Sequence, residues 1–203
     1  MKDLFCIILA GGIGSRFYPL SSTEQPKQFL DFFNEKESLI LKTYKRVSEF
    51  IDQKNIYVLT NKKYSKLTRS HLKDIPLKNI LCEPIQKNTA ASIAYGSFTI
   101  HKKNKNAKII VCPSDHLIKD KKKFKKICLK GFNYLKLKDQ IITIGITPKK
   151  AHTGYGYIQT IKSKNNEITA VKDFKEKPNK KTAQKFVDSK NYLWNSGIFI
   201  FTS

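Results

Sequence analysis

Residues 5–30 read FCIILAGGIGSRFYPLSSTEQPKQFL, and this stretch decides the fold. A short apolar run leads directly into a glycine cluster, as buried strands of α/β proteins do where they end in a ligand-binding loop. The glycines Gly11, Gly12 and Gly14 allow positive φ and let backbone N–H groups approach an anion. The stretch therefore predicts a strand over Leu4–Leu9 and a phosphate-binding loop after it.

Neither of the two best-known glycine motifs fits this loop. A dinucleotide fingerprint, G-x-G-x-x-G, would need a third glycine where Phe17 stands, and a Walker A loop would need Gly-Lys-Ser/Thr. What remains is a loop with Ser15 and Arg16 at its exit and Lys27 soon after. Arginine offers a planar fork and lysine a point charge, so both could reach one polyphosphate. The alternative is a tight glycine turn that carries exposed cations.

Apolar runs and helical patterns alternate along the first 150 residues. Short β-branched runs predict strands at Leu4–Leu9, Ile56–Thr60, Ile109–Cys112 and Ile141–Ile146. Helical spacing predicts one helix capped by Ser38 and running to about Ile51, a second capped by Asn88 or Thr89 and running to about Lys102, and a third over Phe124–Leu135. This order is typical of an α/β fold with a mostly parallel twisted sheet and helices on both faces.

After Pro148 the pattern changes to a mixed β lobe. The stretches GYGYIQTI, EITAVKDF and GIFIF read as further strands, with a short helix near Thr182–Asp188 and a polar hairpin loop at Lys162–Glu167. We expect one domain over residues 1–203 whose second part, from about residue 151, is this lobe.

Length and composition favour a soluble cytoplasmic protein. The chain has 203 residues, of which 40% are hydrophobic, enough for one good core. The early apolar run Leu4–Ala10 is too short to span a membrane or to serve as a signal peptide, so no membrane association is expected. The four cysteines form no C-x-x-C pair, and we expect them to be reduced and to pack as small hydrophobic residues.

The net charge of +23 raises the possibility of nucleic-acid binding. However, only three of the 39 basic residues are arginine, the residue that reads bases and phosphates in bidentate fashion. The excess lysine accompanies abundant Ile, Asn, Phe and Tyr, which share A/T-rich codons. The lysine run at 119–126 also has apolar positions at helical spacing, which favours a solvated helix face. We therefore expect no nucleic-acid partner.

Five ordered stretches resemble one family. They are LAGGIGSRFYPLSSTEQPKQFL at 9–30, EPIQKNTAASIA at 83–94, PSDH at 113–116, TGYGYIQ at 153–159 and FKEKPNKKTAQKFVDSKNYLWNSGIFIF at 174–201. The pattern is similar to the sugar-1-phosphate nucleotidyltransferases, and within them to the bacterial mannose-1-phosphate guanylyltransferases. The resemblance runs from about residue 5 to the last residue. It implies that residues 1–150 bind nucleotide and residues 151–203 bind sugar phosphate.

The resemblance assigns roles in nucleotide and metal binding to residues that could also have a purely structural role. Asp115 ends an apolar strand. A carboxylate there could bind Mg²⁺, or it could simply be solvated in a turn. The resemblance implies that Asp115 is the metal ligand. Asn88 and Thr89 could cap a helix or read a base edge. The resemblance implies that they and Glu83 contact guanine, that Gly11, Gly12, Gly14 and Ser15 bind the nucleotide, and that Arg16 and Lys27 are catalytic.

Sugar-side roles follow in the same way. Gly156 could let the backbone approach a sugar ring or mark a β-bulge. Glu176 and Lys177 alone would read as a solvated pair. The resemblance instead implies that Glu176 contacts sugar hydroxyls, that Lys177 holds the sugar phosphate and that Asn195 binds sugar or phosphate.

The implied reaction is GTP + mannose 1-phosphate → GDP-mannose + pyrophosphate, with Mg²⁺ as cofactor. Alternatives are another sugar nucleotidyltransferase, using glucose 1-phosphate with UTP or dTTP, and a truncated nucleotide-binding remnant without activity. The sequence is also compatible with a homo-oligomer.

The chain departs from the family pattern in two ways. Tyr18, Ser22 and Lys87 stand where the family usually has Trp, Arg and Arg. Family members also continue for many tens of residues after NSGIFIF and supply a second metal-binding aspartate there. We therefore expect this chain to correspond to the N-terminal part of the catalytic domain.

Overall fold

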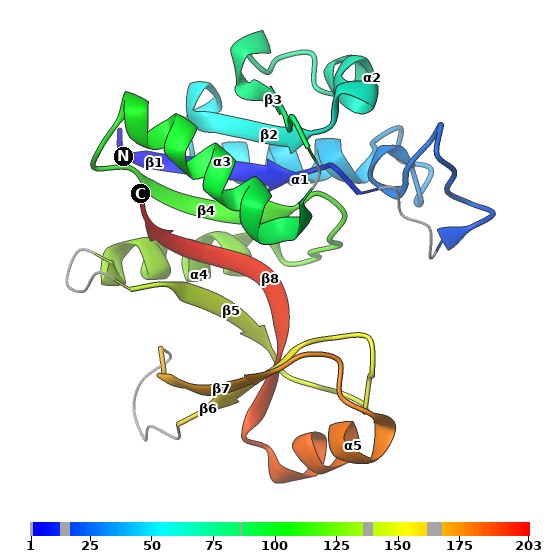
Figure 1. Cartoon of the computed structure of the whole chain (residues 1–203), viewed down its shortest axis with the longest axis vertical. Helices are drawn as coiled ribbons and strands as arrows, with labels where there is room; N and C mark the ends of the chain where they lie inside the picture. Colours follow the sequence, from blue (N-terminus) through cyan, green and yellow to red (C-terminus); the bar gives the residue numbers. More distant parts are fainter. Residues whose placement is uncertain (1, 13–16, 86, 136–139, 162–167) are drawn as a thin grey trace. The chain divides into compact units, whose positions relative to one another are not determined.

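The computed structural model describes residues 2–12, 17–85, 87–135, 140–161 and 168–203 (Figure 1). The chain forms two compact units, one of Met1–Ile142 with Phe199–Ser203 and the other of Thr143–Ile198. The division falls at the start of strand β5 (Ile142–Ile146) and again within strand β8 (Tyr192–Thr202). Among the described residues, no helix is long and apolar enough to cross a membrane.

The first unit is built on a mostly parallel sheet, as predicted. Its central strand β1 (Leu4–Leu9) pairs in parallel with β2 (Ile56–Thr60) on one side and β4 (Lys108–Pro113) on the other. The short strand β3 (Ile80–Cys82) lies parallel to β2. The end of β8 runs antiparallel to β4, where Phe199 is opposite Val111. The order β3-β2-β1-β4 is that of an open α/β sheet, which confirms the predicted fold class.

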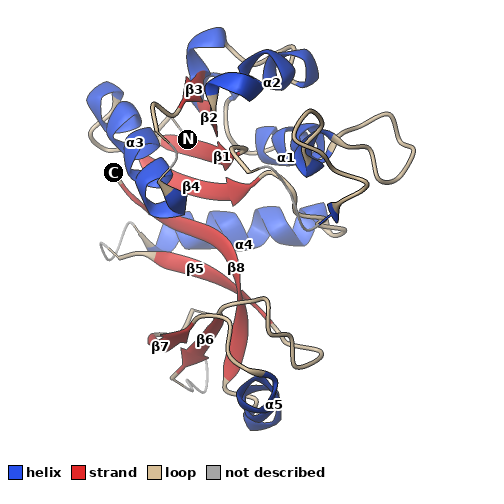
Figure 2. Cartoon of the chain, turned by 45° about the vertical axis from the view of Figure 1, so that its right-hand side comes forward, coloured by secondary structure: helices blue, strands red, loops and turns tan. Residues whose placement is uncertain are grey.

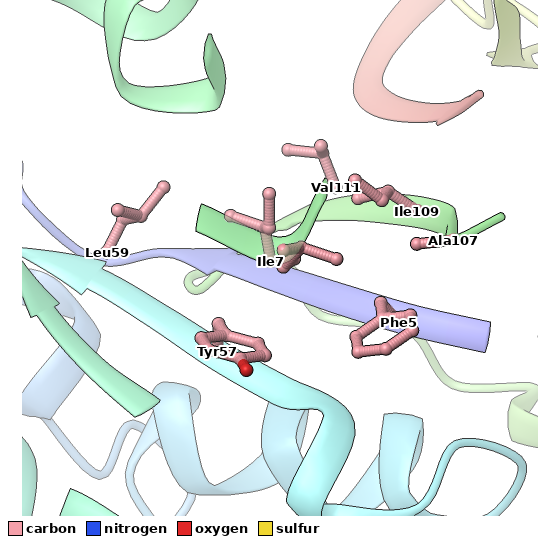
Figure 3. Packing of buried hydrophobic residues seen from close by; sticks show 8 residues of the cluster. Phe5, Ile7, Tyr57, Leu59, Ala107, Ile109 and Val111 are labelled. Carbon is pink, nitrogen blue, oxygen red and sulfur yellow. The ribbon is translucent and has the colours of Figure 1, made fainter. Parts of the chain in front are cut away.

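Helices cover both faces of this sheet (Figure 2). They are α1 (Leu39–Ser48), α2 (Ser65–His71), α3 (Asn88–Lys103) and α4 (Lys121–Tyr134). Helix α3 lies on one face, and α1 and α4 lie on the other. Successive residues of β1 point to opposite faces, so Phe5 and Ile7 join the core under α3 (Figure 3). Cys6 points the other way, toward Arg46 of α1 and Cys128 of α4.

The cysteines match the expectation of reduced, packed thiols. All four are free, and Cys6, Cys112 and Cys128 are buried while Cys82 is half-buried. Burial raises the pKa of the Cys6 and Cys128 thiols, so these groups stay protonated.

Gly96 of helix α3 faces the sheet. A Cβ atom at Gly96 would lie 2.9 Å from the Cδ1 atoms of Ile7 and Leu59. The predicted capping of this helix is wrong: Lys87 occupies the N-cap position, and no side chain caps the helix there. Asn88 instead takes a left-handed conformation with φ of 61°, which asparagine tolerates better than most residues. Asn88 therefore contributes its backbone conformation, and not a side-chain cap, to the turn that leads into the helix.

The second unit is an antiparallel lobe, in line with the predicted mixed β lobe. Strand β6 (Tyr157–Thr160) pairs antiparallel with both β7 (Val171–Lys175) and the first part of β8. Helix α5 (Lys180–Ser189) begins with a cap from Asn179, whose side chain accepts the Thr182 N–H at 2.9 Å. The predicted hairpin loop at Lys162–Glu167 lies outside the described residues.

Asn55 fastens the start of β1 to the turn before β2. Its side chain is buried, and its Nδ2 donates to the carbonyl oxygens of Lys2 at 3.2 Å and Leu4 at 3.1 Å. One buried amide therefore supplies a donor to two backbone carbonyls at the start of the chain.

Replacing Asn55 should destabilise the first unit. We expect Asn55→Ala to lower the free energy of unfolding by about 1–3 kcal/mol, because two backbone acceptors lose their donor. Urea denaturation measures this change. The matched control is Asn133→Ala on the exposed face of α4, which should stay within about 0.5 kcal/mol of the unmodified protein. Equal effects of the two changes would contradict this role of Asn55.

Candidate functional site

A pocket of about 450 Å³ opens in the first unit. It lies where β1, β2 and β3 end and α3 begins, the edge at which open parallel sheets bind ligands. Its volume is typical of small-molecule sites. The lining residues are Leu9, Gly11, Gly12, Leu59, Glu83, Lys87, Asn88, Thr89 and Ser92. The pocket therefore brings together the start of the glycine loop and the residues predicted to contact a base.

The start of the glycine loop is held by Gln28. The Gln28 side chain is only 4% exposed, and its Nε2 donates to the carbonyls of Ala10 at 3.0 Å and Gly12 at 2.8 Å. The Thr60 hydroxyl also donates to the Ala10 carbonyl, at 3.2 Å. These bonds to the Ala10 and Gly12 carbonyls fix the path of the chain from the end of β1 as far as Gly12. Sequence reasoning missed Gln28, because a glutamine that follows Lys27 and lies near Gln25 gives no sign in the sequence that its side chain is buried.

Three predicted residues of this loop, Gly14, Ser15 and Arg16, lie outside the described residues, and their roles stay predictions.

Lys27 and Asp115 meet although 88 positions separate them. Their Nζ and Oδ2 atoms are 3.0 Å apart, and the side chains are 21% and 37% exposed, respectively. The Lys27 ammonium also lies 4.1 Å from the centre of the Phe17 ring, a cation–π contact. An ion pair with this exposure adds little stability. The ion pair matters because it brings two residues that were predicted to have separate roles, Lys27 and Asp115, into direct contact.

Backbone and buried polar contacts fix the position of Asp115. The preceding residue, Ser114, donates its N–H to the carbonyl of Leu9, a residue that lines the pocket. The Ser114 carbonyl accepts the Thr43 hydroxyl at 3.2 Å, and Arg46 in turn donates to the Thr43 hydroxyl at 2.9 Å. Burial lowers the pKa of Arg46, but an arginine starts so high that it stays charged. These residues of α1 were not predicted as part of the site.

The chemistry around Asp115 fits a magnesium ion that also binds a substrate. No cluster of three or more His, Cys, Asp or Glu side chains capable of holding a metal occurs in the described part of the chain. Mg²⁺, however, is commonly held by one or two carboxylates together with substrate phosphates. Asp115, a partly exposed carboxylate, suits that arrangement and not an all-protein cage.

The segment that carries Lys27 is supported from α2. Lys27–Phe29 forms a single 3₁₀ turn, and the Phe29 ring lies 5.3 Å from the His71 ring. His71 Nδ1 is 2.9 Å from the hydroxyl of Ser38. Ser38 was predicted to cap α1. It occupies the N-cap position, but its side chain makes no capping bond and pairs with His71 instead.

In the second unit, the four predicted sugar-side residues lie together. A Cβ atom at Gly156 would lie 2.9 Å from Glu176 Oε2, so only glycine lets this carboxylate come so close to the backbone. Glu176 pairs with Lys177 at 2.8 Å, and both side chains are more than half exposed. The Asn195 N–H donates to the Gly156 carbonyl at 2.8 Å, and the Asn195 Oδ1 accepts from Thr143 at 3.1 Å.

Three aromatic rings form a cluster beside these residues in the chain. Tyr155 stacks on His152 with 4.0 Å between ring centres, and Trp194 meets Tyr155 edge-on at 5.2 Å. Trp194 is half-buried against these two rings.

Comparison with known proteins defines the class. Residues 5–203 match the family model described as "Nucleotidyl transferase", so the chain belongs to the nucleotidyl transferase family.

Among curated proteins, the chain is similar to bacterial mannose-1-phosphate guanylyltransferases. It is 36% identical over 205 residues to that of Salmonella muenchen, covering 99% of this chain and 43% of the relative. It is 35% identical over 197 residues to that of Sinorhizobium fredii, covering 96% of this chain and 38% of the relative. The chain thus spans about two fifths of the length of these relatives.

Solved structures agree with the fold. A Thermus thermophilus protein titled mannose-1-phosphate geranyltransferase superposes with a TM-score of 0.89 and 25% identity, over 100% of this chain and 58% of that one. A Helicobacter pylori protein titled mannose-6-phosphate isomerase gives a TM-score of 0.79 and 31% identity, over 98% of this chain and 70% of that one.

Removing the amide of Gln28 should loosen the pocket. In Gln28→Met the Gly12 carbonyl loses its donor, so we expect the free energy of unfolding to fall by about 1–3 kcal/mol. We also expect the affinity for a fluorescent nucleoside triphosphate, the class of ligand that the resemblance predicts for the glycine loop, to fall several-fold, because the loop must then be ordered on binding. Urea denaturation and fluorescence titration measure the two effects. Gln25→Met, at an exposed position of the same segment, is the control, and unchanged binding in Gln28→Met would contradict the role of Gln28.

Acid should weaken the support that His71 gives to the Lys27 segment. Burial lowers the pKa of His71 below its usual value of about 6.5. The folded state therefore favours neutral imidazole, and its contribution to stability is complete above the unfolded pKa and is lost as the pH falls through the lower, folded pKa. Between pH 7 and pH 5 the unmodified protein should lose more stability than His71→Asn. Parallel losses in urea denaturation at the two pH values would show that His71 does not contribute.

Proposed function

We propose that the chain carries the catalytic part of a mannose-1-phosphate guanylyltransferase, which transfers GMP from GTP to mannose 1-phosphate and releases pyrophosphate. The observation that carries this proposal is the pocket of the first unit, which Gly11 and Gly12 line together with Glu83, Asn88 and Thr89. A glycine loop suits phosphates, and polar groups at the start of α3 suit a base edge. The names of the curated relatives support the choice of guanine and mannose.

The reaction needs positioning and charge neutralisation more than acid–base chemistry. An oxygen of the sugar phosphate attacks the α-phosphorus of GTP, a new P–O bond forms, and the bond to the β-phosphate oxygen breaks in line. Pyrophosphate leaves with that electron pair. The attacking group is already an anion, so no general base has to remove a proton. Catalysis of such transfers comes mainly from alignment and electrostatic stabilisation.

The residues divide this work. The glycine loop with Ser15 and Arg16 would hold the phosphates that leave, and Lys27 would offset the charge that develops at the α-phosphoryl group. In the second unit, Lys177 would hold the sugar phosphate, while Glu176 and Asn195 would bind the sugar. Asp115 would hold Mg²⁺, which supplies further neutralisation of the triphosphate when bound.

The ion pair of Lys27 and Asp115 gives these two groups a defined resting state. Before substrate binds, each neutralises the other at 3.0 Å. A triphosphate offers Lys27 a stronger anionic partner, and the Asp115 carboxylate that this frees would hold Mg²⁺ together with triphosphate oxygens. Binding therefore exchanges one ion pair for several charge-assisted contacts.

We also propose a cytoplasmic location, because the substrates are nucleotides and sugar phosphates and all four cysteines are free. A homo-oligomer stays a prediction.

The test is turnover after removal of the paired charges. We expect Lys27→Ala and Asp115→Ala each to lower mannose-1-phosphate-dependent pyrophosphate release from GTP at least tenfold while the fold is retained. Lys54→Ala, which removes an exposed lysine elsewhere in the same unit, should leave turnover unchanged.

Three results would contradict the proposal. Near-normal turnover in Lys27→Ala or Asp115→Ala would remove these residues from the mechanism. Faster reaction with UTP or dTTP and glucose 1-phosphate would favour a different sugar nucleotidyltransferase. Binding of GTP without turnover would favour a nucleotide-binding protein that lacks activity.

A further inference from the structure

One hydroxyl group in the pocket has no role in the function proposed above. Ser92 lies in α3, one helical turn after Asn88, and its Oγ donates a hydrogen bond to Oε1 of Glu83. Both side chains are half-buried and both line the pocket. The backbone of Glu83 is fixed as well, since its N–H donates to the Thr60 carbonyl at 2.8 Å. The backbone of Glu83 is therefore held by the sheet, and its carboxylate is held by helix α3.

The hydroxyl has two acceptors within reach and one hydrogen to give. The second acceptor is the carbonyl of Asn88, 3.1 Å away. A serine hydroxyl donates only once, and an ionised carboxylate is the stronger acceptor. The bond to Glu83 is thus the one that Ser92 makes when the carboxylate is charged. A glutamate side chain has several rotatable bonds, and this contact selects one of its positions.

No lysine or arginine among the described residues forms an ion pair with Glu83, although Lys87 lines the same pocket. The carboxylate therefore keeps accepting capacity toward the pocket. An ionised carboxylate accepts hydrogen bonds and cannot donate them. It suits a ligand edge that presents two adjacent N–H donors.

The edges of the nucleobases differ in this respect. Guanine presents a ring N–H next to an exocyclic amino group, so one carboxylate can accept from both. Uracil and thymine present a ring N–H between two carbonyl oxygens, which repel a carboxylate. A carboxylate held in one position can therefore discriminate between these bases. A mobile carboxylate would have to be ordered when the base binds, and the entropy cost of that ordering would reduce the gain in binding free energy.

We propose that Ser92 is a positioning residue for base recognition, which holds the Glu83 carboxylate as acceptor for a purine carrying a ring N–H beside an amino group. This inference rests on the proposed function, because it assigns the base to the pocket that contains Glu83. It adds Ser92, which acts through Glu83 and does not itself have to touch the nucleotide.

The simpler alternative is that Ser92 only bonds back to its own helix. Serine and threonine often donate to the carbonyl four residues earlier. Thr99 does this in the same helix, donating to the Tyr95 carbonyl at 2.8 Å without any carboxylate partner in the described part of the chain. Loss of such a bond would change all nucleotide affinities alike, so the informative quantity is a ratio of affinities.

The experiment compares GTP with ITP, which lacks the exocyclic amino group. Calorimetric titration gives the affinity of each nucleotide for the unmodified protein and for Ser92→Ala, Ser92→Thr, Glu83→Gln and the double variant Ser92→Ala/Glu83→Gln. We expect the unmodified protein to bind GTP about tenfold or more tightly than ITP. Ser92→Ala should reduce this ratio about threefold or more, and Ser92→Thr, which keeps the hydroxyl, should preserve it. In the Glu83→Gln background, Ser92→Ala should have no further effect on the ratio.

Thr99→Ala is the matched control and should leave the GTP-to-ITP ratio unchanged. The inference is overturned if Ser92→Ala keeps the full ratio, or if Thr99→Ala lowers it equally. Those results leave the proposed function intact, because GTP still binds. If the unmodified protein binds none of GTP, ITP or UTP, the proposed function fails and this inference fails with it.

Discussion

The side-chain amide of Gln28 is the contact on which the architecture of the pocket depends. It donates to the carbonyls of Ala10 and Gly12, where the chain leaves the central strand. Glycine loses more conformational freedom on folding than any other residue, so a chain that passes through Gly11 and Gly12 needs an external restraint to keep one path. Gln28 provides this restraint from the 3₁₀ turn that also carries Lys27. One short segment therefore shapes the loop and delivers the cation.

The parallel sheet then determines what can meet at this edge. The chain crosses back after each strand, so the ends of β1, β2 and β3 come to the same side and bring residues with them that are far apart in sequence. Glu83 follows β3, while Gly11 follows β1, and both line one pocket. Asp115, which follows β4, reaches Lys27. The glycine loop and the polar residues before α3 thus follow different strands and can vary independently.

Sequence reasoning predicted the buried strands well because their apolar runs are unambiguous. The bounds of β1 and β2 are those predicted, and β5 differs by one residue. Sequence reasoning missed β3 and α2, which are too short to show a periodic pattern of apolar residues. It also misplaced the N-cap of α3. Asparagine is a residue type that often caps helices, but Asn88 is the first residue of α3, in a left-handed conformation, and Lys87 occupies the N-cap position.

The site was predicted from motifs and not from geometry. Sequence spacing gives no hint that Lys27 and Asp115 touch, because contact across 88 positions depends on the whole sheet. Gln28 and Ser92 were missed for a related reason. Their importance lies in which groups their side chains reach, namely two carbonyls and one carboxylate, and neither partner is a near neighbour in sequence.

The central claim is that the chain transfers a guanylyl group to a sugar phosphate. The most direct measurement follows the label of GTP radiolabelled at the α-phosphate when the protein is incubated with Mg²⁺ and mannose 1-phosphate. The account predicts that the label appears in GDP-mannose only when mannose 1-phosphate is present. Binding of labelled GTP without any label in a nucleotide sugar would contradict it.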